Sequence, residues 1–167
     1  MKKTASAPPV AAPRKRATGG KPVVPGFVDD YLANLLGLAA NLIMTEFHAI
    51  VAQHDLSPSE WRVLATVASV PDGEDCSMAR LMHFTGAKQP TLTRLLDRMV
   101  EAGHVERMDA QQDRRVTLMR LSPKGNMLVR KLINLAQAHE ARVLEPLGPA
   151  AGESLKKVLK RLIELHR

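Results

Sequence analysis

The sequence predicts a mainly α-helical fold with one short two-stranded β-hairpin. Leu, Ala, Met and Val abound while aromatic residues make up only 3% of the chain, a balance that favours helix over sheet. Apolar residues recur at three- and four-residue steps over most of the chain after residue 26. Two short runs with strand character, His104–Met108 and Val116–Leu121, flank a polar segment and indicate the hairpin.

The first 25 residues differ in composition from the rest. They hold six basic residues, no acidic residue and almost no large apolar side chain. Such a segment cannot bury enough apolar surface to offset the entropy lost on ordering. We therefore expect residues 1–25 to form a disordered basic arm, either simply solvated or in contact with the phosphates of a nucleic acid. Residues 26–167 are long enough for one ordinary domain with its own core.

Charge is distributed unevenly along this domain. Segment 26–76 holds one basic and eight acidic residues, whereas segment 77–125 holds nine basic and five acidic residues. A localised basic surface is the expected footprint of a polyanionic partner. The single cysteine, Cys76, excludes an intramolecular disulfide and fits a reducing compartment. No apolar run approaches the roughly 18 residues that span a bilayer, so we expect a cytoplasmic protein without a membrane partner.

Helices are predicted at both ends of the domain. Residues 27–53 carry two adjacent apolar stripes, and so broad an apolar face suggests burial on two sides, as in a dimer. Ser122-Pro123 opens a long helix over about 123–146, and Pro149 opens a last helix. These N- and C-terminal helices form the predicted helical dimerisation region.

Three shorter helices lie between these ends. Ser57-Pro58-Ser59-Glu60 has the pattern of a capping box and begins a helix that runs to about Ser69. Ser77 is expected to cap a helix over 78–85, which Gly86 ends. Pro90 lies at the start of the third, and Gly103 closes that helix as a left-handed C-cap.

The last two of these helices, joined by a tight turn, suggest a helix-turn-helix, whose second helix enters the DNA major groove. One face of this second helix is polar, with Asp97 as its only acid. Gln and Arg can pair with adenine and guanine edges, and Thr and Lys suit phosphates. The alternative is an ordinary solvated face. The candidate DNA-binding residues are Lys88, Gln89, Thr91, Thr93, Arg94 and Arg98.

The tip of the hairpin, Asp109–Arg115, places Arg114 and Arg115 on a protruding ribbon. Arginine gains from the concentrated negative potential of a narrow minor groove. Asp113 is expected to pair with one of these arginines and brace the ribbon. The alternative is an exposed salt bridge with little effect.

These motifs together resemble the MarR (multiple antibiotic resistance regulator) family of winged helix-turn-helix transcription regulators. The resemblance covers about 27–165 and is strongest over 77–125. It departs from the family at Lys88, where Ser is frequent, and at Thr85, where an apolar residue is usual. It rests on Pro90-Thr91-Leu92-Thr93-Arg94-Leu95-Leu96-Asp97-Arg98, Gly103-His104-Val105-Glu106-Arg107, Asp113-Arg114-Arg115 and Leu121-Ser122-Pro123-Lys124-Gly125.

The resemblance implies a homodimer whose DNA-binding winged helix spans about 56–122 and whose dimerisation helices span about 27–53 and 123–166. It also implies that the polar face of the recognition helix meets the major groove or its flanking phosphates, and that Arg115 enters the minor groove, braced by Asp113. The expected partner is double-stranded DNA with a palindromic operator.

The resemblance further implies a repressor that a small molecule releases from its operator. Ligands in the family commonly lie where the dimer helices meet the DNA-binding lobe, which makes His48, Trp61 and Arg62 the candidate effector-binding residues. An Arg or His beside an aromatic wall suits a small aromatic carboxylate, such as a hydroxylated pyridine carboxylate. The resemblance extends to repressors of nicotinate or related aromatic-acid catabolism. Each of the three residues also has an alternative interpretation without a ligand. His48 could be packed and hydrogen-bonded, Trp61 could be a core residue, and Arg62 could be a solvated surface charge.

No catalytic residue, cofactor or metal site is predicted, and we expect no enzyme. Of the six histidines only His48 and His54 lie close together in sequence, and a spacing of six does not share one helical face. Cys76 lacks the orienting acid that a Cys–His nucleophile needs. Two other function classes stay open, an effector-independent architectural DNA-binding protein and a helical protein-interaction module.

Overall fold

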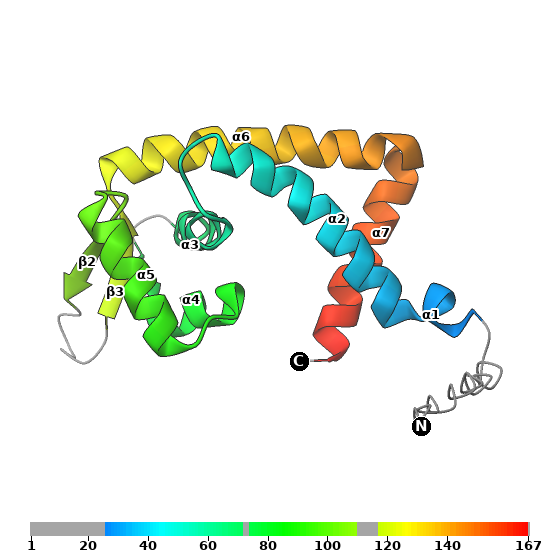
Figure 1. Cartoon of the computed structure of the whole chain (residues 1–167), viewed down its shortest axis with the longest axis horizontal. Helices are drawn as coiled ribbons and strands as arrows, with labels where there is room; N and C mark the ends of the chain where they lie inside the picture. The colour runs from blue at the N-terminus through cyan, green and yellow to red at the C-terminus, as the bar shows by residue number, and fades with distance from the viewer. Residues whose placement is uncertain (1–25, 72–73, 110–116, 167) are drawn as a thin grey trace, which may run out of the picture. The chain divides into compact units, whose positions relative to one another are not determined.

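The computed structural model describes residues 26–71, 74–109 and 117–166 (Figure 1). The chain clusters into two compact units, Met1–Gly37 and Leu38–Arg167. Its fold is mainly helical with a small antiparallel sheet. In chain order, the elements are α1 Phe27–Asp30, α2 Leu32–Ala52, α3 Pro58–Ala68, β1 Cys76–Ser77, α4 Met78–Thr85, α5 Gln89–Glu101, β2 Val105–Asp109, β3 Thr117–Leu121, α6 Pro123–Leu144, the 3-10 turn η1 Glu145–Leu147 and α7 Pro149–Leu165.

The first predicted helix is interrupted. A single helix over 27–53 is wrong at Tyr31, whose extended backbone separates α1 from α2. The Asn34 amide donates a hydrogen bond of 2.8 Å to the carbonyl of Val28, which no longer has a helical partner. The Phe27 and Tyr31 rings stack with centroids 5.0 Å apart. These local contacts favour the break over a continuous helix.

The helix starts follow the predicted caps. Ser57 and Glu60 form the reciprocal capping box of α3, with Ser57 N–H donating to Glu60 Oε2 at 2.7 Å. The hydroxyls of Ser77 and Ser122 accept from backbone N–H groups in the first turns of α4 and α6. Gly103 follows α5 with φ of 71°, the left-handed conformation expected of it.

The β structure is larger than predicted. The sequence indicates a two-stranded wing, whereas the structure has a three-stranded antiparallel sheet of order β1-β3-β2. Val105 pairs with Leu121 across β2 and β3, and Cys76 pairs with Met119 across β1 and β3. Strand β1 has only two residues, too few for a periodic signal, and it exists because β3 offers it a free edge.

The core of the second unit lies between α3, α4, α5, α6 and the sheet. Its fully buried side chains include Leu64, Leu81, Leu96, Met119 and Leu132. Near Thr85, the turn between α4 and α5 contributes Ala87 to this core, whereas Phe84 is exposed. The Thr85 hydroxyl donates to the Leu81 carbonyl at 2.6 Å, so a polar residue is tolerated at this position.

The long C-terminal helix ends slightly earlier than predicted. Helix α6 stops at Leu144, and Pro146 lies in a 3-10 turn that Gly148 ends with φ of 75°. Helix α7 then begins at Pro149, as expected. Proline cannot donate the backbone hydrogen bond that a continuing α-helix requires, which places the end of α6 at this point.

The prediction that no segment is long and apolar enough to span a bilayer is wrong for helix α2. By length and composition alone, α2 is long and apolar enough to cross a membrane, and little of it is buried within the chain. Helices that pack against a partner can have the same length and apolar composition. Exposed large apolar side chains occur on α2 and also on α7, among them Leu38, Leu42, Val158 and Ile163.

Candidate nucleic-acid interface

Helix α5 has two sharply different faces. Leu92, Leu95, Leu96 and Met99 are buried in the core of the second unit. The opposite side exposes Thr91, Arg94 and Arg98, which follow one another at steps of three and four residues and so share one stripe. Burial of the inner face holds the helix in place, and the outer stripe presents two guanidinium groups and a hydroxyl to solvent.

The first turn of α5 places the remaining candidate residues. Lys88 is the N-cap residue and makes no side-chain capping bond, the loss expected where a hydroxyl residue is replaced by Lys. Lys88 and Gln89 are exposed beside the free N–H groups of this turn. Thr93 is only half exposed, and its hydroxyl donates to the Gln89 carbonyl at 3.0 Å. Thr93 is therefore the least available of the predicted contacts.

An ion pair that the sequence analysis did not foresee links α5 to the hairpin. Arg107 on β2 donates to Asp97 on α5 at 2.5 Å. Both side chains are about half exposed, so the pair contributes little to stability. It neutralises Asp97 and links the polar face of α5 to β2. The two residues are ten apart in sequence, and no local motif predicts their meeting.

The tip of the hairpin lies outside the described residues. The structure follows β2 to Asp109 and resumes at Thr117. Asp113, Arg114 and Arg115 fall in between, so the minor-groove contact and its bracing by Asp113 stay predictions from the sequence. The strands that carry the tip are paired in register from Val105–Leu121 to Asp109–Thr117.

A hollow of about 390 Å³ lies between the start of α4, the start of α5 and the hairpin. Gln89 and Thr93 line it from α5, and Arg107 and Thr117 line it from β2 and β3. Ser77 closes it at the N-terminus of α4, where backbone N–H groups favour an anion. Polar groups from α5, β2, β3 and the N-cap of α4 therefore line one hollow.

The turn after α5 is held tightly against the start of α6. The Ser122 hydroxyl donates to the Gly103 carbonyl at 2.6 Å, and the Ser122 N–H donates to the His104 carbonyl at 3.2 Å. A Cβ atom at Gly125 would lie 1.9 Å from the same His104 carbonyl oxygen. The end of α5, the start of β2 and the first turn of α6 are thus one closely packed joint.

The candidate effector residues lie at the junction of α2 and α3. Trp61 is half-buried and meets Phe47 edge to face, with ring centroids 5.3 Å apart. Burial and the neighbouring Arg62 guanidinium lower the pKa of His48 below its ordinary value. In the described part of the chain, Arg62 has no carboxylate partner and donates only to the Met44 sulfur, at 3.8 Å. The structure thus brings the three residues into one neighbourhood.

Sequence reasoning missed a buried histidine beside this junction. His139 on α6 is only 5% exposed, lies 3.3 Å from the Glu46 carboxylate through Nε2, and packs on the Phe47 ring. Glu46 and His139 are 93 residues apart, so no spacing in the sequence signals the pair. Together with Trp61, they connect the α2–α3 junction to the middle of α6.

Cys76 is buried in strand β1 of the sheet, and burial raises the pKa of its thiol, although nearby Arg80 opposes the shift. A thiol in this state is a poor nucleophile at neutral pH. Within residues 26–71, 74–109 and 117–166, no three His, Cys, Asp or Glu side chains are grouped to hold a metal ion.

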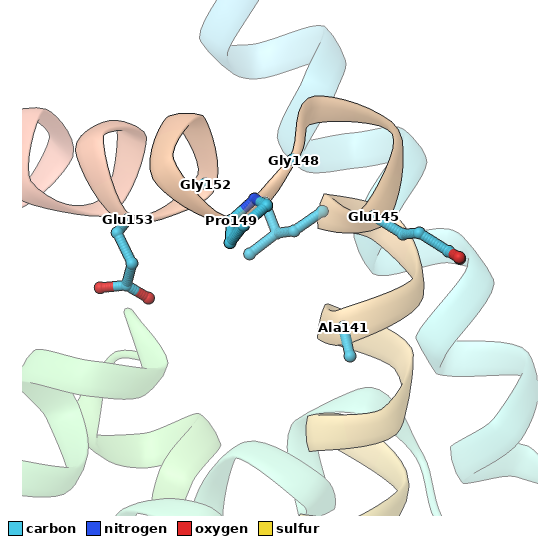
Figure 2. Close-up of a pocket in the computed structure, with 7 residues that line it drawn as sticks. Ala141, Glu145, Gly148, Pro149, Gly152 and Glu153 are labelled. Carbon is cyan, nitrogen blue, oxygen red and sulfur yellow. The ribbon is translucent and has the colours of Figure 1, made fainter.

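A further cavity of about 320 Å³ lies at the corner between α6, η1 and α7. Ala141, Pro149 and Gly152 line it, and Figure 2 shows the Glu145 side chain pointing away from Pro149. Glu145 and Glu153 extend in different directions, so their carboxylates do not converge on one point. Small, mostly apolar groups line this corner, in contrast to the basic surface of α5.

A helix-turn-helix with a basic outer face on α5, followed by an antiparallel hairpin, defines a winged helix-turn-helix DNA-binding fold. Comparison with known proteins then identifies the family of the chain. The MarR family matches residues 54–116. The chain is 31% identical to the MarR family transcriptional regulator SPO1453 from Silicibacter pomeroyi DSS-3, covering 84% of this chain and 98% of that one with a TM-score of 0.73. The chain belongs to the MarR family and is a transcription regulator.

Two further relatives agree with this assignment. The transcriptional regulator PecS of Dickeya dadantii (strain 3937) is 26% identical over 125 residues, which is 75% of each protein. The repressor CouR, solved bound to a 23-mer DNA duplex, shares the fold with a TM-score of 0.71 at 23% identity, covering 88% of this chain and all of that one. The resemblance drawn from the sequence motifs is thereby confirmed at the level of the family and the fold.

Proposed function

We propose that this regulator is a homodimeric repressor that binds a palindromic double-stranded operator and leaves it when a small aromatic acid binds. The observation that carries the DNA-binding part is the outer face of α5, where Arg94, Arg98 and Thr91 are exposed over a buried apolar inner face. Arg can pair with guanine edges, and Thr can meet phosphates. Lys88 and Gln89 extend this surface at the first turn of α5. Arg114 and Arg115 lie outside the described residues, and their contact with DNA is proposed from the sequence alone.

The dimer is supported by apolar surface that the single chain leaves exposed. Leu38 and Leu42 on α2 and Val158 and Ile163 on α7 are all more than half exposed. So much exposed apolar surface marks a site of association. A two-fold dimer also spaces two recognition helices by about one turn of DNA, ~34 Å, as a palindromic site requires.

The proposed function is tested by sequencing genomic fragments that the purified protein retains, and then measuring anisotropy with the recovered site and with a scrambled duplex. We expect the recovered site to bind at least ~10³-fold more tightly at physiological salt. Light scattering of the same sample is expected to give the mass of two chains. Equal affinity for both duplexes would indicate an architectural DNA-binding protein, and no affinity for either would indicate a helical interaction module. A monomer with normal affinity would overturn the dimer.

Repression is relieved in this proposal by a ligand near His48, Trp61 and Arg62. Arg62 offers a cation that lacks a carboxylate partner among the described residues, and Trp61 offers an aromatic wall. A ligand releases DNA only if it binds the two states of the protein with different affinity. The packing around Trp61 is therefore expected to change on binding.

We predict that small aromatic acids, including hydroxylated pyridine carboxylates, change Trp61 fluorescence over the concentrations that dissociate DNA. Trp61 is the only tryptophan, so the signal has one source. Arg62→Ala and His48→Ala are expected to weaken both responses, whereas Arg142→Ala, an exposed arginine on α6, serves as the control. If a broad panel of acids changes neither signal, the effector class is wrong. If an active acid works equally well on both variants, the pocket lies elsewhere.

A further inference from the structure

A cavity of about 550 Å³ lies among the turn that follows α2, the turn after α5 and the first turns of α6. Its polar lining consists of His54, Asp55, His104, Lys124 and Lys131. Two lysines and one aspartate are among the lining residues, so the lining carries a net positive charge even when both histidines are neutral. The surroundings therefore favour an anionic ligand.

The two lysines are not neutralised by ion pairs in the part of the chain that the structure describes. Lys124 donates to the Ala102 carbonyl at 2.8 Å, where α5 ends. Lys131 has no hydrogen-bond partner among the described residues. At least one ammonium group is thus available to a ligand, and the other lies next to the joint between the recognition helix and the wing.

His104 adds an imidazole ring to the lining. Its Nδ1 is buried and has no hydrogen-bond partner, and burial together with Lys124 lowers the pKa of the ring despite the opposing effect of Glu60. A buried N–H without a partner is rarer in proteins than a buried acceptor without one. The neutral ring is therefore expected to carry its proton on Nε2, the nitrogen left to meet a ligand.

The remaining wall is apolar. Met127 and Leu128 line the cavity from α6, and Met127 is 71% exposed. A bare inorganic anion leaves this surface in water, whereas a ligand with a hydrocarbon body covers it. The chemistry of the lining is that of a carboxylate attached to an apolar group.

We propose that this cavity is a second small-molecule site, which binds an organic carboxylate with its anionic group among Lys131, Lys124 and His104 Nε2 and its apolar body against Met127 and Leu128. The site is separate from the effector site near Trp61, and its occupancy does not depend on the proposed repressor function. A ligand here contacts the residues that hold the end of the recognition helix.

Benzoate is the probe that tests this site. Its binding is followed through the ¹H–¹³C signals of the His104 ring in the labelled full-length protein. These signals are assigned by comparison with His104→Gln. We expect a saturable shift, with benzoate binding about tenfold more tightly than acetate because only benzoate covers the apolar wall. Lys131→Gln is expected to weaken binding about fivefold or more, since a charge-assisted hydrogen bond is lost. Lys157→Gln on α7 removes the same charge elsewhere and leaves the response unchanged.

Arg62→Ala keeps the His104 response if the two sites are separate. A response that fails to saturate would overturn the site, as would equal affinities for Lys131→Gln and Lys157→Gln. Loss of the His104 response in Arg62→Ala would assign the binding to the effector site instead. Equal affinity for acetate and benzoate would show that Met127 and Leu128 do not contribute to binding, and the proposed ligand class would then be wrong.

Discussion

Gly125→Ala is expected to destabilise the protein by about 3 kcal/mol or more, because overpacking against a rigid neighbour forces the backbone to move. The new Cβ would lie 1.9 Å from the carbonyl oxygen of His104 and 2.9 Å from its carbonyl carbon. Both atoms belong to the backbone, and the Ser122 hydrogen bonds hold that backbone in place. Urea unfolding followed by circular dichroism measures the loss as a lower midpoint.

Gly152→Ala is the matched control on α7. A Cβ there meets the Leu144 side chain at 3.5 Å, which is ordinary van der Waals contact, and its φ is compatible with any residue. Replacing a helical Gly by Ala is therefore expected to leave the stability unchanged or raise it by ~0.5–1 kcal/mol. If Gly125→Ala unfolds at the midpoint of the unsubstituted protein, the close approach of α6 to His104 is wrong.

Arg94→Ala is expected to weaken binding to the recovered operator by ~1–3 kcal/mol, which is about 5- to 150-fold. Arg94 lies at the centre of the exposed stripe of α5, and no described carboxylate forms an ion pair with it. Its removal is therefore expected to remove a contact with DNA without breaking an ion pair within the described part of the protein. Anisotropy titrations at several salt concentrations measure both the affinity and its salt dependence.

The salt dependence separates two roles for Arg94. If Arg94 reads a base edge, its removal reduces the preference for the recovered site over a scrambled duplex. If it meets a phosphate, affinity falls equally for both duplexes, and the salt slope decreases by ~1. Arg161→Ala on α7 is the control for net charge. Unchanged operator affinity in Arg94→Ala would show that the outer face of α5 is not the DNA-binding surface.

The residues of the motifs that identify the family have separate physical roles in the structure. Gly103 is the left-handed residue that ends the recognition helix. Ser122 caps α6 and holds the turn at Gly103, while Gly125 lets that turn approach α6 closely. The sequence shows these residues as an uninterrupted signature, and the structure explains them as parts of one joint between the recognition helix, the wing and α6.

Some predictions failed because a contact distant in sequence competed with a local pattern. Strand β1 was not predicted, since two residues carry no periodicity and Cys76 pairs with Met119, far along the chain. The ion pair between Asp97 and Arg107 and the contact between His139 and Glu46 have no local signal either. The break at Tyr31 is an exception, because the apolar stripes of 27–53 concealed a local interruption.

The sequence by itself determined where the helices from Pro58 onward begin, the caps at Ser57, Ser77 and Ser122, the two faces of α5 and the family. These features depend on neighbours within one or two turns, where hydrogen bonds and apolar periodicity are read directly from residue order. Only the tertiary structure decided which charges meet and which cavities form, such as the one beside His104 and Lys131. Those depend on distances between segments far apart in the chain, which packing sets and residue order does not encode locally.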